Sequence, residues 1–111
     1  MLSLSLPQIA DLQLDEARVS SSARAALTIH GGHERSLRET VIAILAGHGL
    51  GEHESPGEAT LQVLRGHVRL IAGDDSWEGL PGDHLVIPDR RHSLDAIEAA
   101  AVLLTDVEPL P

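Results

Sequence analysis

Two histidines with charged neighbours stand out as the residues of this chain that could do chemistry. His53 is flanked by glutamates, with Glu58 five residues further on, and His92 directly follows Arg90 and Arg91. Imidazole and carboxylate groups act as general acids and bases, and both ligate divalent metal ions. The chain contains no Cys, Lys or Tyr, which excludes thiolate nucleophiles, Schiff-base lysines, disulfides and a tyrosine acid. Any catalysis must therefore use His, Asp, Glu, Ser, Arg or a bound metal.

The charge of the chain argues against several classes of partner. Its 111 residues carry 17 acidic and 8 basic side chains, a formal net charge of -9. Nucleic-acid binding needs clustered basic residues, and the arginines here are scattered, so we expect no nucleic-acid partner. The amino terminus has neither a basic region nor a long apolar run, so we expect no membrane association and a cytoplasmic protein. Lys, Asn, Phe and Tyr have AT-rich codons, and their absence indicates a GC-rich bacterial genome.

Short strands dominate the predicted secondary structure, and one helix precedes them. Apolar residues at helical spacing predict an amphipathic helix from Pro7 to about Val19. The alternation of Leu2, Leu4 and Leu6 before it fits either a strand or a frayed terminus. The strands that we expect after the helix are 25–29, 37–45, 59–64, 66–72, 83–88 and 100–105. We expect turns or loops at 31–32, 47–51, 66, 73–75 and 80–82. Many short strands at regular intervals are typical of a sandwich or barrel.

The glycines and histidines from Gly47 onward resemble the first of the two sequence motifs of the cupin superfamily. That motif is Gly, five residues, His-x-His, three or four residues, Glu, six residues, Gly. Gly47, His53 and Gly66 occupy its first Gly, first His and last Gly. Ser55 replaces its second His and Ala59 replaces its Glu. Two positions that ligate metal in the family are therefore changed here.

A second stretch resembles the other cupin motif, which is Gly, five residues, Pro-x-Gly, two residues, His, three residues, Asn. Gly82, Pro88 and His92 take the places of its Gly, Pro and His. Arg90 stands at the place of the second Gly and Ala96 at that of the Asn, and one residue is missing between the Pro and the His. The resemblance covers roughly residues 37–104.

The resemblance implies an all-β fold of the RmlC-like cupin type, a double-stranded β-helix or jelly-roll barrel with a short N-terminal helix. We expect one domain, in which a helix and leading strand from residues 1–36 pack on a barrel formed by residues 37–111. Spare apolar strand surface at the amino terminus predicts a homodimer.

In cupins the metal ligands lie on facing strands inside the barrel. The resemblance therefore implies that His53 and His92 converge there, with Glu58 as the candidate third ligand if its strand bulges by one residue. A weakly bound divalent metal, Zn, Ni, Fe or Mn, is the cofactor that this set implies.

Three interpretations of the histidine pair stay open from the sequence. The rings hold a metal, or they are remnants of the family site that hydrogen-bond to each other, to Ser55 or to water. In the third interpretation they orient a small-molecule ligand in a pocket. The pocket residues that we expect are Ser55, Leu61, Val63, Arg90 and Leu94.

The function that these observations favour is a small-ligand-binding or regulatory protein with a degenerate metal site. The alternative is a metal-dependent enzyme of the cupin oxygenase or isomerase kind that uses His53 and His92. We expect acidic structural partners for Arg90 and Arg91, and we expect Trp77 to cover an edge of the core or a subunit contact.

Overall fold

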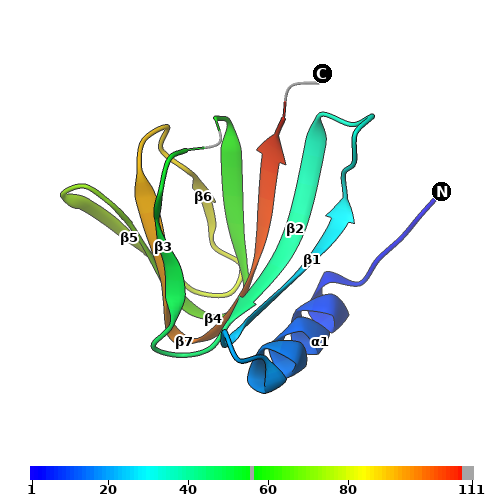
Figure 1. The fold of residues 1–111 in the computed structure, drawn as a ribbon, viewed down its shortest axis with the longest axis horizontal. Coiled ribbons are helices and arrows are strands. Elements are labelled where there is room, and N and C mark those ends of the chain that lie inside the picture. The colour runs from blue at the N-terminus through cyan, green and yellow to red at the C-terminus, as the bar shows by residue number, and fades with distance from the viewer. Residues whose placement is uncertain (56, 109–111) are drawn as a thin grey trace.

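The computed structural model describes residues 1–55 and 57–108 and consists of one helix and seven antiparallel strands (Figure 1). In chain order the elements are α1 (Leu6–Val19), β1 (Arg24–His30), β2 (Leu37–Ile44), β3 (Gly49–His53), β4 (Ala59–Ala72), β5 (Asp75–Gly79), β6 (His84–Val86) and β7 (His92–Val107).

Helix α1 begins one residue earlier than expected, and its start carries the usual N-terminal signals. The Ser5 hydroxyl accepts a hydrogen bond from the Gln8 amide, and Pro7 lies in the first turn, where a free N–H is not needed. Leu2 and Leu4 lie before the helix on an exposed arm that leaves the body of the molecule (Figure 1). The strand interpretation of residues 2–6 is therefore wrong, because the helix begins within them.

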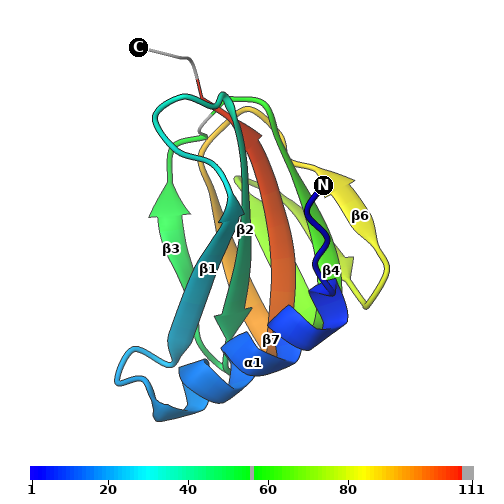
Figure 2. The same ribbon diagram turned by 90° about the vertical axis from the view of Figure 1, so that its right-hand side faces the viewer.

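Helix α1 lies on the outer face of the sheet, as Figure 2 shows. Its buried residues are Ala10, Leu14 and Ala17, and they pack with Ala43 of β2 and Ala101 of β7. Alanine on both sides brings the helix close to the strands. The helix thus covers the outside and leaves the inner face of the same strands to the barrel. No helix among the described residues is long and apolar enough to cross a membrane.

The strands form one sheet that folds over on itself, with the order β1-β2-β7-β4-β5, β3 paired to β7 and β6 paired to β4. The two long strands, β4 and β7, each contribute to both walls of the barrel. The first half of β4 pairs with β6 and its second half with β5, while β7 pairs first with β3 and then with β2. The result is the expected all-β jelly-roll architecture.

Strand β4 runs through Gly66, where the sequence predicts a turn between two strands. Gly66 has a φ of +79°, and a Cβ there would overlap the carbonyl oxygen of Ala99. The register of β4 against β7 shifts on both sides of this position. Glycine is needed because the strand bends here without stopping, so the expected strands 59–64 and 66–72 are one strand.

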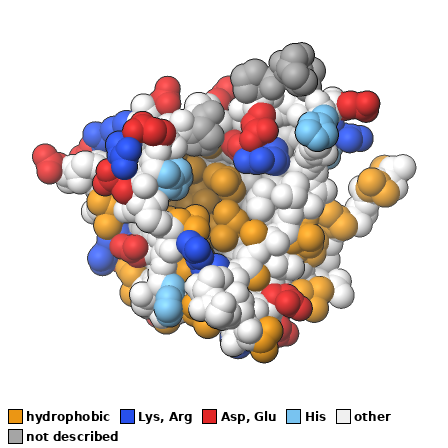
Figure 3. All heavy atoms as spheres, viewed as in Figure 1, with side chains coloured by type: hydrophobic (Ala, Val, Ile, Leu, Met, Phe, Trp, Pro, Cys, Tyr) orange, Lys and Arg blue, Asp and Glu red, His pale blue; other side chains and the backbone are white. Residues whose placement is uncertain are grey.

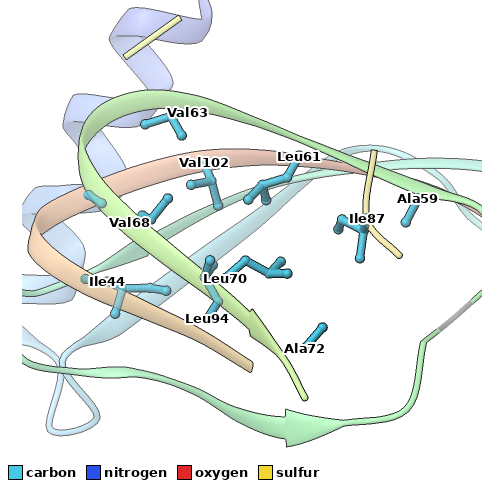
Figure 4. Packing of buried hydrophobic residues seen from close by; sticks show 12 residues of the cluster. Ile44, Ala59, Leu61, Val63, Val68, Leu70, Ala72, Ile87, Leu94 and Val102 are labelled. Atoms are coloured by element: carbon cyan, nitrogen blue, oxygen red, sulfur yellow. The ribbon is translucent and has the colours of Figure 1, made fainter. Parts of the chain in front are cut away.

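The barrel interior is aliphatic, as Figure 4 shows. Leu61 and Val63 from the first half of β4 meet Leu70 from its second half, and Leu94 and Val102 of β7 complete this part of the core. Because the chain has no Phe or Tyr, small branched side chains fill the space between the walls. Trp77 of β5 packs against this cluster, which confirms its expected place at an edge of the core.

Candidate functional site

His53 and His92 face each other on neighbouring strands. They are register partners of β3 and β7. Their ring centroids lie 4.5 Å apart and their planes meet at 64°, an edge-to-face contact. His92 is buried, at 4% exposure, whereas His53 is exposed. The pair therefore lies at the boundary between the barrel interior and the solvent.

Each ring is oriented by the backbone carbonyl of the residue two positions before it. Nδ1 of His53 lies 2.9 Å from the carbonyl oxygen of Gly51, and Nδ1 of His92 lies 2.8 Å from that of Arg90. A carbonyl oxygen only accepts, so each neutral ring carries its proton on Nδ1 and donates it to the carbonyl. The Nε2 atom of each ring then keeps its lone pair and can accept a hydrogen bond or ligate a metal.

The two rings line a small cavity whose other walls are aliphatic, among them Leu61, Leu70 and Leu94. Its volume is about 40 Å³, enough for a few water molecules. On the face shown in Figure 3 the molecule is hollowed at its centre, where hydrophobic side chains are visible and a histidine lies at the edge.

The expected pocket residues do not all meet at this cavity. Leu61 and Leu94 line it, whereas Val63 is fully buried elsewhere in the core. The Ser55 hydroxyl is hydrogen-bonded to the backbone of Gly57, and Ser55 does not line the cavity. Arg90 lines a different cavity.

The residues present do not fit the metal centre that the cupin motifs imply. A catalytic zinc site usually has three protein ligands, and His53 and His92 supply two. Ser55 and Ala59 stand where the motif has its other ligands. Within residues 1–55 and 57–108, no group of three or more His, Cys, Asp or Glu side chains is placed to hold a metal ion. Glu58, the candidate third ligand, is exposed and belongs to no such group.

Arg91 ties the start of β7 to β3 beside the histidine pair. Its Nε lies 2.7 Å from a carboxylate oxygen of Glu52, and its Nη1 lies 2.9 Å from one of Glu54. These hydrogen bonds, Glu52 first, raise the pKa of Arg91 above its ordinary value. The expectation that the two arginines before His92 have acidic structural partners is confirmed, since Arg90 pairs with Asp75.

The sequence does not predict a buried carboxylate that lies on the inner face of β7. Asp106 is 1% exposed, and Arg38 of β2 donates to its Oδ2 at 3.4 Å. Asp106 Oδ1 and Arg38 Nε have no hydrogen-bond partner among the described residues. Nothing in the sequence distinguishes this aspartate from the other acidic residues. Only the pairing of β2 with β7, which sets it opposite Arg38, identifies it.

Solved structures of other proteins share the fold of this chain. No protein-family model and no curated protein matches the chain. A cupin superfamily protein from Desulfitobacterium hafniense superposes with a TM-score of 0.77 and 15% identity, covering 97% of this chain and 92% of that chain. An RmlC-like cupin protein from Desulfovibrio desulfuricans gives 0.66 and 24%, covering 76% and 81%.

A conserved protein of unknown function from Streptococcus pyogenes gives a TM-score of 0.71 and 27% identity, covering 81% of this chain and 78% of that chain. The likeness to these structures concerns the arrangement of the strands. It assigns no ligand and no reaction.

Proposed function

We propose that this chain, which has the cupin fold, is a small bacterial ligand-binding or regulatory protein whose barrel receives a small molecule at His53 and His92 in place of a metal ion. The state of the two rings carries this proposal. In its neutral form each ring donates its Nδ1 proton to a backbone carbonyl, so that Nε2 carries the lone pair. The two ring centroids lie 4.5 Å apart, and no third metal ligand is grouped with the rings in the described chain, which favours a hydrogen-bonding ligand.

The chemistry of the cavity limits the class of ligand. Two acceptor nitrogens call for a group that donates, such as a hydroxyl or an ammonium. A cavity of about 40 Å³ takes only the end of a molecule, so the rest must extend past the exposed His53. The chain carries a net charge of -9, so a neutral or cationic ligand is favoured over an anion.

A metal-dependent enzyme is the second candidate, and one observation favours it. Histidines that bind metal usually donate their other ring N–H to a carbonyl or carboxylate, which is the arrangement of both rings here. The missing third protein ligand counts against it. Metal titration separates the two candidates.

The ligand-binding proposal can be tested by following the imidazole resonances by NMR. We expect ethanolamine, which carries a hydroxyl and an ammonium, to shift the ring signals of His53 and His92 saturably. His48 and His84 are exposed and lie outside the cavity, so their signals serve as internal controls. Acetate, which only accepts hydrogen bonds, should leave the pair unchanged.

Variants then decide whether binding depends on the pair. His53→Ala and His92→Ala should each abolish the shifts of the remaining ring, while His84→Ala should keep them. The proposal fails if ethanolamine and related alcohols and amines produce no saturable shift, or if binding survives in both cavity variants.

A further inference from the structure

A second and larger cavity lies beside the histidine cavity, where β5 and β6 flank β4. Its volume is about 150 Å³, against about 40 Å³ for the first. Leu70 of β4, Trp77 of β5, Leu85 of β6 and Pro88 form much of its wall. Leu70 lines both cavities, so the two are neighbours, but neither histidine reaches the second one.

The position of Trp77 depends on Gly79, two residues along β5. A Cβ at Gly79 would overlap the far edge of the indole ring, so the ring lies over the glycine. Gly79 is buried and Trp77 is half-buried. Glycine thus allows the indole to lie along its own strand, where it forms one wall of the cavity.

An ion pair contributes the charged groups of this cavity, and Ser76 also lines it. Arg90 Nη2 donates to Asp75 Oδ2, and both residues are among those that line the cavity. Their side chains are 48% and 78% exposed, so the pair lies at the solvent side. It offers donors and acceptors together, but its charges cancel. The cavity therefore combines an apolar interior with a polar, neutral rim.

We propose that this cavity is a second ligand site and that it binds an uncharged ring-sized molecule carrying one hydroxyl group. An apolar cavity of about 150 Å³ is large enough for a benzene ring. The ring of the ligand would pack on Trp77, and its hydroxyl would both accept from Arg90 and donate to Asp75. A carboxylate in the same place would face Asp75, and an ammonium would face Arg90.

Trp77 is the only Trp in a chain without Tyr or Phe, so the intrinsic fluorescence comes from a residue in the wall of this cavity. The test is a fluorescence titration with benzyl alcohol, compared with benzoate and benzylamine. We expect a saturable change with benzyl alcohol and binding weaker by about tenfold or more for the two charged compounds, since each leaves a charge unpaired or opposed. Equal binding of benzoate, or no saturable response to benzyl alcohol, overturns the proposal.

Matched variants locate the site. Arg90→Gln removes the cationic half of the rim and should weaken benzyl alcohol binding by about tenfold, the loss of one charge-assisted hydrogen bond. Arg69→Gln is the control, because Arg69 is similarly exposed, at 43%, and lies in β4 but does not line the cavity. Unchanged binding in Arg90→Gln, or an equal loss in Arg69→Gln, would place the site elsewhere.

A third variant tests the wall of the cavity without touching a polar group. Gly79→Ala forces the indole off its strand, and we expect it to shift the emission of the free protein and to abolish binding. Circular dichroism verifies that the variant is folded. A folded Gly79→Ala protein that binds benzyl alcohol as the unmodified protein does would contradict the proposal.

Discussion

Individual residues around the histidine pair divide into those that orient the rings and those that hold the strands carrying them. The carbonyls of Gly51 and Arg90 fix the two rings through bonds within their own strands or loops. Arg91 acts differently, because it joins the short strand β3 to the start of β7 through two carboxylates. The rings therefore depend on Arg91 for the position of the strand, but not for their tautomer.

Replacing Arg91 should loosen β3 without unfolding the protein. In Arg91→Gln both ion pairs are lost, and we expect faster amide hydrogen exchange in β3 with little change in Tm, since exposed ion pairs contribute little to global stability. Arg18→Gln, which breaks an exposed pair with Asp15 on α1, is the control and should leave β3 exchange as it is. Unaltered exchange in Arg91→Gln would show that strand pairing alone holds β3.

Burial of the Asp106 carboxylate should destabilise the protein when its ion-pair partner Arg38 is removed. Arg38→Ala leaves that carboxylate buried and unpaired, and we expect a loss of about 1–3 kcal/mol in the free energy of unfolding, measured with urea. Adding Asp106→Asn to this variant removes the charge and should recover part of the loss. A double variant no more stable than Arg38→Ala would mean that charge burial is not the cause.

At the scale of elements, the sequence predicts what apolar periodicity and capping determine. Helix α1 was predictable from Pro7 and its buried stripe, whereas β4 was expected as two strands and only residues 100–105 of β7 were expected as a strand. Strands β3 and β5 were missed, because glycines make up two of five residues in β3 and β5 is mostly polar. Both are held by pairing with the long strands, which a local pattern does not report.

Gly66 tests the interpretation of β4 as one continuous strand. Gly66→Ala meets both an unfavourable positive φ and an overlap with the Ala99 carbonyl. Gly82→Ala is the matched control, with a φ of +94° but open space around it. We expect a cost of about 1–2 kcal/mol for Gly82→Ala from the backbone alone, and a larger cost for Gly66→Ala. Equal losses of unfolding free energy in the two variants would show that β7 moves away from the added methyl group without a loss of stability.

For the molecule as a whole, the cupin motifs predict the barrel and the approach of His53 to His92. They do not predict the contacts of the other site residues, because a motif fixes the backbone position of a residue but not the groups that its side chain contacts. The Ser55 hydroxyl is hydrogen-bonded to the backbone of Gly57, and Arg90 lies at another cavity. The second cavity depends on Gly79 and Trp77, whose packing no spacing rule reveals.

We propose that the protein is a homodimer. Leu2 and Leu4 are 98% and 57% exposed on the arm before α1, and burying such side chains against a second copy removes apolar surface from water. Light scattering during size exclusion should give about twice 11.8 kDa. Leu2→Ser with Leu4→Ser should shift the protein toward the monomer, while Leu12→Ser, exposed on α1, should not. The proposal is contradicted if light scattering gives the monomer mass for the unmodified protein.

Metal binding tests the central claim most directly, that the histidine pair serves a small molecule and not a catalytic metal. The measurement is metal content of tag-free protein after dialysis, followed by calorimetric titration with Zn²⁺ and Ni²⁺. A structural zinc site with its full set of ligands has a binding free energy of about 10–16 kcal/mol. Because this site has only two protein ligands, we predict no stoichiometric metal and an affinity no tighter than micromolar. Stoichiometric metal that survives dialysis and disappears in both His53→Ala and His92→Ala would contradict the account and favour the enzyme.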